Sequence, residues 1–271
     1  MLKNITIGQY IQGKSFLHEM DPRIKILNLM GFMILIFAVS SYYAYLFLYI
    51  FVLSVILFSK IPLKYTLKGV RPILYLCIFT FIINLIYIKT GTELASFWII
   101  HIYSDAIISS SKVLLKLTLL VISASLLTLT TTPIVLTDGL EKLLKPIGIL
   151  GISSHEIAMM MTIALRFIPT LAMETDRIMK AQASRGADFD TGNIFRRIRS
   201  FIPVIIPLIA GAFKRAIDLA DAMESRCYRG GKGRTRLRQL KIGRVDFISV
   251  IVMISAVGGM IIFSKLYRGG Y

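Results

Sequence analysis

Five apolar stretches, each close to the length a helix needs to cross a bilayer, constrain the fold of this chain more than any other feature of its sequence. They cover residues 24–40, 42–58, 72–88, 113–129 and 247–263. A helix spans the hydrocarbon core with about 20 mostly apolar residues. Hydrophobic residues make up 55% of the chain, too many for an ordinary soluble domain. The sequence therefore predicts an all-α integral membrane protein with about five transmembrane helices.

Three local features refine this prediction. Only Ser41 separates the first two stretches, which predicts a tight transmembrane hairpin. Lys116 falls inside the fourth stretch, where a charge is costly, so we expect it to face protein or water and to reach a backbone carbonyl or the interface. Residues 91–111 hold Trp98 among apolar residues, which indicates an interfacial or re-entrant segment and leaves a short extra helix open.

Basic residues in the short loops predict the orientation. At or before the start of the first span lie Lys3, Lys14, Arg23 and Lys25, and between the second and third spans lie Lys60, Lys64, Lys68 and Arg71. The turn at Ser41 carries none, and the loop after the third span carries only Lys89 and Lys112. By the positive-inside rule the N-terminus is cytoplasmic. The side of the C-terminus stays open, because five spans place Lys265 outside, against that rule.

More than a hundred residues separate the fourth span from the fifth. We predict three regions: residues 1–130 with four transmembrane helices, residues 131–245 as a cytoplasmic region, and residues 246–271 with the last span. Of the 32 Lys and Arg residues, 19 fall between Thr130 and Val245. The whole chain has a net charge of +17, which needs an anionic partner such as anionic lipid, nucleic acid or an acidic protein surface. We expect residues 131–245 to carry the function.

Two long amphipathic helices are predicted within this region. Ser153 and Glu156 form a capping box that begins the first, whose apolar positions follow the helical period to Ser184. We expect Pro169 to kink it. The second presents apolar residues on one face and charged residues on the other, and two prolines, Pro203 and Pro207, mark either its start or a kink.

Both helices end in related sequences. The first motif is Ser184-Arg185-Gly186, preceded by Ala181, and the second is Ser225-Arg226-Cys227, preceded by Ala222. Small residues beside an arginine let a helix end enter a groove, where the guanidinium binds a carboxylate bidentately. For one arginine alone, interaction with its own helix C-terminus is the simpler explanation. Two copies favour a paired docking site.

These residues resemble the transmembrane component of energy-coupling factor transporters, prokaryotic importers of vitamins and metal ions. The resemblance covers the layout of the whole chain, and its specific motifs lie in residues 165–169, 174–186, 213–216 and 222–230. It implies a multi-pass protein of a prokaryotic plasma membrane with a cytoplasmic coupling domain, in which two long helices cross. Each helix end carries an Ala-Arg-Gly signature that docks on one of two ABC-type ATPase subunits.

Carried over to this chain, the resemblance places ATPase docking on six residues: Ser184, Arg185, Gly186, Ser225, Arg226 and Cys227. Serine replaces alanine in both motifs and stays small, whereas Cys227 replaces a glycine. A cysteine adopts positive φ less readily than glycine. The sequence therefore leaves Cys227 and Gly230 as alternative left-handed residues at the end of the second helix.

The resemblance also implies a small membrane protein that binds the substrate and packs on the apolar faces of the two helices. We place this contact on Met160, Met161, Phe213 and Ile217, although ordinary burial explains any single methionine equally well. The substrate itself is chosen by that partner, so the sequence leaves it open, as it does whether the partner is dedicated or shared.

No nucleotide-binding motif Gly-x-x-x-x-Gly-Lys-Ser/Thr occurs in the chain. We therefore expect this chain to be non-catalytic and to bind no cofactor, with ATP and Mg²⁺ held by the partner ATPases. The basic stretch from Gly230 to Arg238 fits anionic lipid better than nucleic acid, for which we predict no role.

Two other classes of protein are alternatives. A membrane enzyme would use Asp188 and Asp190 to hold Mg²⁺ near a lipid phosphate. It would need further acidic ligands, and we expect Glu174 and Asp176 to pair along their own helix with Arg177 and Lys180 instead. A stand-alone secondary transporter lacks support, because the spans show no inverted repeat and Lys116 has no intramembrane counter-charge.

Overall fold

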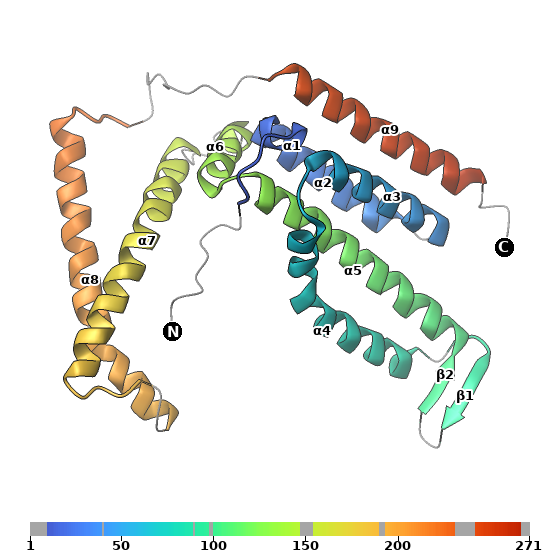
Figure 1. The fold of residues 1–271 in the computed structure, drawn as a ribbon, viewed down its shortest axis with the longest axis horizontal. Helices are drawn as coiled ribbons and strands as arrows, with labels where there is room; N and C mark the ends of the chain where they lie inside the picture. The colour runs from blue at the N-terminus through green and yellow to red at the C-terminus, as the bar shows by residue number, and fades with distance from the viewer. Residues whose placement is uncertain are drawn as a thin grey trace. The chain divides into compact units, whose positions relative to one another are not determined.

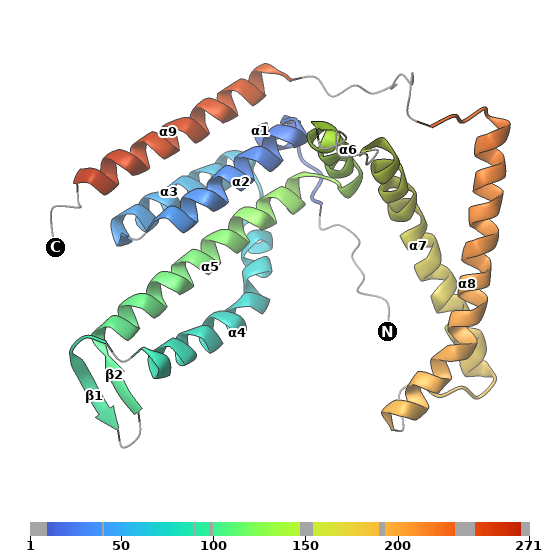
Figure 2. The same ribbon diagram turned by 180° about the vertical axis from the view of Figure 1, so that it is seen from behind.

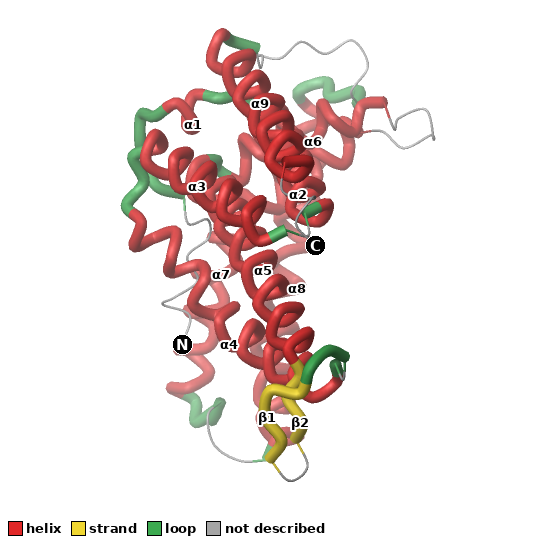
Figure 3. Tube along the Cα trace, turned by 90° about the vertical axis from the view of Figure 1, so that its right-hand side faces the viewer, coloured by secondary structure: helices red, strands yellow, loops and turns green. Residues whose placement is uncertain are grey.

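The computed structural model describes residues 10–39, 41–88, 90–97, 100–146, 154–189, 193–230 and 242–266 of the 271-residue chain. Within these ranges helices form nearly all of the regular structure, and one pair of antiparallel strands is the exception (Figure 3). The predicted all-α membrane fold is therefore confirmed.

The chain packs as two compact units (Figure 1). The membrane unit comprises residues 8–139 and 240–271, and the helix-pair unit comprises residues 1–7 and 140–239. The membrane unit contains α1 (Phe16–Glu19), α2 (Pro22–Ala38), α3 (Tyr42–Ser59), α4 (Leu63–Tyr87), β1 (Glu93–Phe97), β2 (Ile100–Tyr103), α5 (Ser104–Thr130) and α9 (Arg244–Leu266). The helix-pair unit contains α7 (Ser154–Ser184) and α8 (Ile194–Ser225), while α6 (Pro133–Leu144) includes residues of both units.

The predicted transmembrane hairpin is formed by α2 and α3. Asp21 caps α2 by accepting a hydrogen bond from the Arg23 amide at 2.9 Å, and Pro22 occupies the first helical position. At the far end of α3, Lys60 adopts a left-handed conformation with φ of 53°, and its amide bonds to the Leu57 carbonyl. These caps fix where the two apolar helices begin and end.

The core of the membrane unit lies where α2, α3 and α5 meet, with α9 contributing at its edge. Its buried side chains are apolar: Phe32, Leu35, Ile36, Val39, Ala44, Tyr45, Leu48, Val52, Ile56, Ile61, Leu119, Leu126, Leu129 and Met260. The Tyr45 hydroxyl, which is polar and buried, donates to the Val39 carbonyl at 2.8 Å. This bond fastens α3 to the residue that ends α2.

The segment after α4 differs from the prediction. β1 and β2 form an antiparallel hairpin (Figure 2). Phe97 pairs with Ile100 and Ser96 with His101, and α5 begins at Ser104. The alternative of a short extra helix in this segment is therefore wrong. Isoleucine and tyrosine in residues 100–103 favour a strand, but apolar runs this short do not distinguish a strand from a helix. Trp98, the proposed aromatic anchor, lies outside the described residues.

Five described helices are long and apolar enough to cross a membrane, but two of the five differ from those predicted. The regions found are Tyr42–Ser59, Ser104–Thr130, His155–Ser184, Arg197–Ser225 and Arg244–Ile262. The predicted first span corresponds to α2, which has only 17 residues, and the apolar part of α4 is the shorter Ile73–Leu85.

Length and mean hydropathy therefore do not distinguish α7 and α8 from the helices predicted to span the membrane. Their charged residues do. α7 carries four charged residues between positions 174 and 180. One such charge at the centre of a bilayer costs about 3 kcal/mol on insertion scales. We accordingly treat α7 and α8 as amphipathic helices with one charged face.

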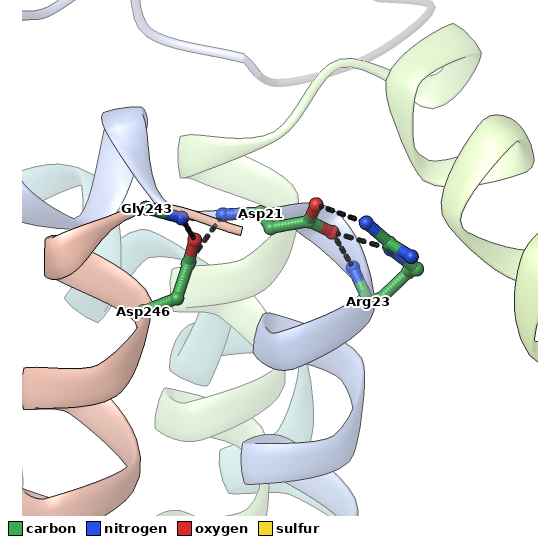
Figure 4. Close-up of polar contacts among 4 residues, drawn as sticks. All are labelled: Asp21, Arg23, Gly243 and Asp246. Atoms are coloured by element: carbon green, nitrogen blue, oxygen red, sulfur yellow. Dashed lines mark hydrogen bonds and ion pairs between the residues drawn. The ribbon is translucent and has the colours of Figure 1, made fainter. Parts of the chain in front are cut away.

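A buried polar network holds the start of α9 against the start of α2 (Figure 4). The Asp246 carboxylate accepts hydrogen bonds from the amides of Asp21 and Gly243, each at 2.7 Å. The Asp21 carboxylate in turn forms an ion pair with Arg23 at 2.8 Å. Because two buried carboxylates would be costly without partners, this network fixes how α9 packs on the hairpin.

Two lysines within the spans have partners in the membrane unit. For Lys116 of α5 we predicted contact with a backbone carbonyl or the interface, and its Nζ lies 5.3 Å from the centroid of the Phe37 ring of α2. Lys25 is only 4% exposed, and its Nζ donates to the Thr130 carbonyl at 3.3 Å and to Thr131 Oγ1 at 3.0 Å. Lys25 thereby connects α2 to the end of α5.

Candidate docking site

The two long helices of the helix-pair unit cross, as both views of the ribbon show (Figures 1 and 2). An ion pair between Glu174 of α7 and Arg215 of α8 joins them. The prediction that Glu174 pairs along its own helix is therefore wrong. Both side chains are about one-third exposed, so water screens the pair, and its value lies in fixing where the helices meet more than in stability.

The bounds of α7 and α8 bear on the predicted starts and ends. α7 ends at Ser184 as predicted and continues through Pro169, while Ser153 of the predicted capping box lies outside the described residues. α8 begins at Ile194, so Pro203 and Pro207 lie within it and do not mark its start. The α8 ribbon changes direction towards its N-terminal end (Figure 2), which is the usual effect of proline in a helix.

Both helices stop with the same hydrogen-bond pattern. At the end of α7, the Gly186 amide bonds to the Ala183 carbonyl and the Ala187 amide to the Gln182 carbonyl, both at 3.0 Å. At the end of α8, the Cys227 amide bonds to Glu224 at 2.8 Å and the Tyr228 amide to Met223 at 3.0 Å. This is the Schellman motif, repeated 41 positions later.

The left-handed residue of each cap occupies the third position of its motif. Gly186 has a φ of 88°, and Cys227 has a φ of 56°. No heavy atom lies within 4 Å of a Cβ built on Gly186, so conformation and not crowding favours glycine there. Of the two alternatives for α8, Cys227 ends the helix, although the left-handed conformation costs a residue with a Cβ about 1–2 kcal/mol. Gly230 is also left-handed, with a φ of 81°, but lies beyond the cap.

The six predicted docking residues are all exposed. We call Ser184, Arg185 and Gly186 the α7 end, and Ser225, Arg226 and Cys227 the α8 end. Each serine hydroxyl donates to a carbonyl of its own helix, at 3.1 Å for Ser184 and 3.0 Å for Ser225. Within the part of the chain that the structure describes, neither arginine forms an ion pair. Both guanidinium groups therefore remain available to an external carboxylate.

The two ends are equally far from the crossing. Arg185 lies 11 residues after Glu174, and Arg226 lies 11 residues after Arg215. We call the segment from the crossing to the arginine the arm of each helix. At about 1.5 Å per residue, each arm is about 16 Å long. Sequence reasoning missed this crossing point, although the equal spacing from an acidic and a basic residue to the two arginines was a usable signal.

The residues predicted to contact a substrate-binding partner are Met160, Met161, Phe213 and Ile217, and all four are exposed. Phe213 and Ile217 lie on α8, where they continue a row of exposed apolar side chains at intervals of three and four residues: Ile198, Ile202, Ile205, Ile206 and Ile209. This row, which we call the α8 stripe, includes Phe213 and Ile217. Exposed apolar surface of this extent is typical of an interaction face.

The alternative Mg²⁺ site finds no support among the described residues. Asp188 is exposed, and Asp190 lies outside the described ranges. In the described chain no group of three or more His, Cys, Asp or Glu side chains is placed to hold a metal ion.

Comparison with known proteins gives consistent matches over most of the chain. Residues 13–237 match the family model described as cobalt transport protein, CbiQ. The chain is 53% identical over 248 residues to the energy-coupling factor transporter transmembrane protein EcfT of Ruminiclostridium cellulolyticum, with 92% of each chain covered. It is 48% identical to the protein of that name from Clostridium kluyveri, over 99% of this chain and 100% of the relative. The one from Lactococcus lactis is 41% identical, over 98% and 100%.

Proposed function

Because the chain belongs to the CbiQ cobalt transport protein family and is a transmembrane component of an energy-coupling factor transporter, we propose that it transmits ATP-driven movement to a substrate-binding membrane subunit. In this proposal, two ABC-type ATPase subunits bind the α7 and α8 ends. ATP and Mg²⁺ belong to those subunits, and the transported substrate is a vitamin or another micronutrient. The chain itself is a transport subunit and not an enzyme.

The observation that carries the proposal is the identical construction of the two exposed helix ends. Each presents an arginine without an ion-pair partner in the described chain, directly before a left-handed residue in the same cap. Two equal ends suit two equivalent acidic grooves, one on each ATPase, in which a guanidinium binds a carboxylate bidentately. Two unrelated partners would give no reason for matched ends.

Equal arms supply a means of transmission. The Glu174–Arg215 pair joins α7 and α8 at a point 11 residues before each arginine. If the ATPases approach one another on binding ATP, both ends move together, and the crossing converts this movement into a change of angle between the helices. The substrate-binding subunit tilts as that angle changes.

The orientation follows from the charges of the chain. The helix-pair unit holds most of the basic residues, and ATP is cytoplasmic, so the proposal places this unit and the N-terminus in the cytoplasm. A net charge of +17 also favours contact with anionic lipid headgroups.

Purification of the tagged chain from its native membrane in mild detergent tests the proposal. We expect two ABC-type ATPases and one small apolar membrane protein to be recovered with it, in a complex that hydrolyses ATP. A chain recovered without any ATPase would contradict the proposed coupling role.

The α8 stripe leads to a separable prediction. Replacing Phe213 and Ile217 with serine is expected to release the substrate-binding subunit and leave both ATPases bound. Two large apolar side chains contribute about 3 kcal/mol or more when buried, which is roughly a hundredfold in affinity. The ratio of subunits after affinity purification measures the effect.

Phe247 and Ile251 provide a matched control on α9. They are the same two residue types at the same spacing and are also exposed. Replacing them with serine should leave the subunit ratio unchanged. Equal loss of the substrate-binding subunit in both variants would contradict a specific contact at the α8 stripe.

A further inference from the structure

A cavity of about 410 Å³ lies within the membrane unit. The ends of four helices surround it: the start of α2, the end of α3, the end of α5 and the start of α9, with α1 beside them. Most of its wall is apolar, and Phe32, Phe51, Val52 and Leu126 are among the residues that line it. Cavities that bind small molecules measure about 300–1,000 Å³ and combine an apolar wall with a few polar groups. We call this space the α2 cavity.

One cation faces the α2 cavity. Lys25 is the only charged residue of its lining within the described chain. It is 4% exposed, and both of its hydrogen bonds go to neutral oxygen atoms of Thr130 and Thr131. No carboxylate oxygen lies within 4 Å of its Nζ among the described residues.

The nearest acidic residues are engaged with other groups. Asp21 holds Arg23 in an ion pair, and the two oxygens of Asp246 accept from the amides of Asp21 and Gly243 (Figure 4). A buried ammonium without a direct counter-ion is costly. An anionic occupant of the α2 cavity would offset that cost.

The lining also indicates where an occupant enters. Phe58 of α3 and Val252 of α9 line the α2 cavity and are exposed, with Phe58 at 76%. A phenylalanine exposed on a membrane helix is more favourable beside acyl chains than beside water. The cavity therefore opens on the lipid-facing surface, and its occupant comes from the bilayer.

We propose that the α2 cavity binds one anionic phospholipid, with the lipid phosphate at Lys25 and an acyl chain along the apolar wall. The lysine supplies the charge that selects the headgroup. The Asn28 amide nitrogen adds a donor beside it, because it gives one hydrogen to the Ser249 hydroxyl at 3.2 Å and has a second. Because the lipid touches α2, α3, α5 and α9 together, it acts as a structural part of the membrane unit.

Native mass spectrometry of the full-length chain tests this site. The chain is released from nanodiscs that contain equal amounts of phosphatidylglycerol and phosphatidylcholine, at an energy that removes loosely bound lipid. We expect one phosphatidylglycerol to remain per chain. Lys25→Met keeps the length of the side chain and removes its charge, and it should reduce retention about tenfold or more, as expected for the loss of a charge-assisted hydrogen bond.

Two further variants keep the test decisive. Lys116→Met removes another lysine of the spans that does not line the cavity and should retain the lipid as the wild type does. Val55→Trp fills the cavity from α3 without touching the charge and should also lose the lipid. Retention that is unchanged in both Lys25→Met and Val55→Trp, or equal retention of the two lipids by the wild type, would overturn the proposal.

Discussion

Reversing the charge of both Arg185 and Arg226 to glutamate is expected to release the two ATPase subunits from the complex. Each substitution replaces the guanidinium with a carboxylate, which then faces the proposed carboxylate of the ATPase groove. The attraction between the two groups becomes repulsion. Breaking a hydrogen-bonded charge pair at an interface costs about 2–5 kcal/mol, and the two ends lose this together. The measurement is the amount of ATPase recovered with the tagged chain, and substrate uptake by vesicles should fall to background.

A control with the same change in net charge separates docking from general electrostatics. Arg177 and Lys214 are exposed basic residues on α7 and α8 that lie away from the helix ends. Their double replacement by glutamate should leave both ATPases bound. If the ATPases also stay bound to the Arg185→Glu, Arg226→Glu chain, the helix ends are not the docking site.

The single variants test whether the two ends are equivalent. Because both ends have the same cap and the same exposed arginine, Arg185→Glu and Arg226→Glu should weaken the complex to a similar degree. A large effect at one end and none at the other would contradict paired docking on two equivalent grooves.

Breaking the helix crossing is expected to stop uptake while ATP hydrolysis continues. Glu174→Arg places two like charges at the point where α7 meets α8 and removes the ion pair that fixes their crossing, yet leaves both docking ends intact. The pair is partly exposed, so the free energy of unfolding should change by only about 1 kcal/mol or less. The measurement is substrate uptake by proteoliposomes relative to their ATP hydrolysis.

A charge exchange provides the decisive comparison. The double variant Glu174→Arg, Arg215→Glu restores an ion pair of opposite polarity and should recover uptake. Asp176→Arg reverses a charge two residues further along α7 that forms no ion pair in the described chain, and should leave uptake near the wild-type level. Uptake that stays normal in Glu174→Arg, or fails to recover in the double variant, would show that this crossing does not transmit movement.

The local features of the helix-pair unit were predictable because their signals lie within a few residues of each other. The end of α7 at Ser184 follows from the apolar period and from Gly186, which readily takes the left-handed cap. The repeated Ser-Arg pair was visible in the sequence and supported the family resemblance that the comparisons confirm. For α8 the sequence left Pro203 and Pro207 as marking either the start or a kink, because proline occurs at helix boundaries and at kinks, and the structure places both within the helix.

The sequence by itself determined that this chain is a helical membrane protein, where its apolar hairpin turns, and which two arginines end its long amphipathic helices, since length, periodicity and capping are local properties. Only the tertiary structure decided which distant side chains meet. It pairs Glu174 with Arg215 and Asp246 with the amide of Asp21, 225 residues away, and it shapes the cavity around Lys25. These contacts depend on which faces of separate helices pack together. A periodic pattern specifies an apolar face but not its partner.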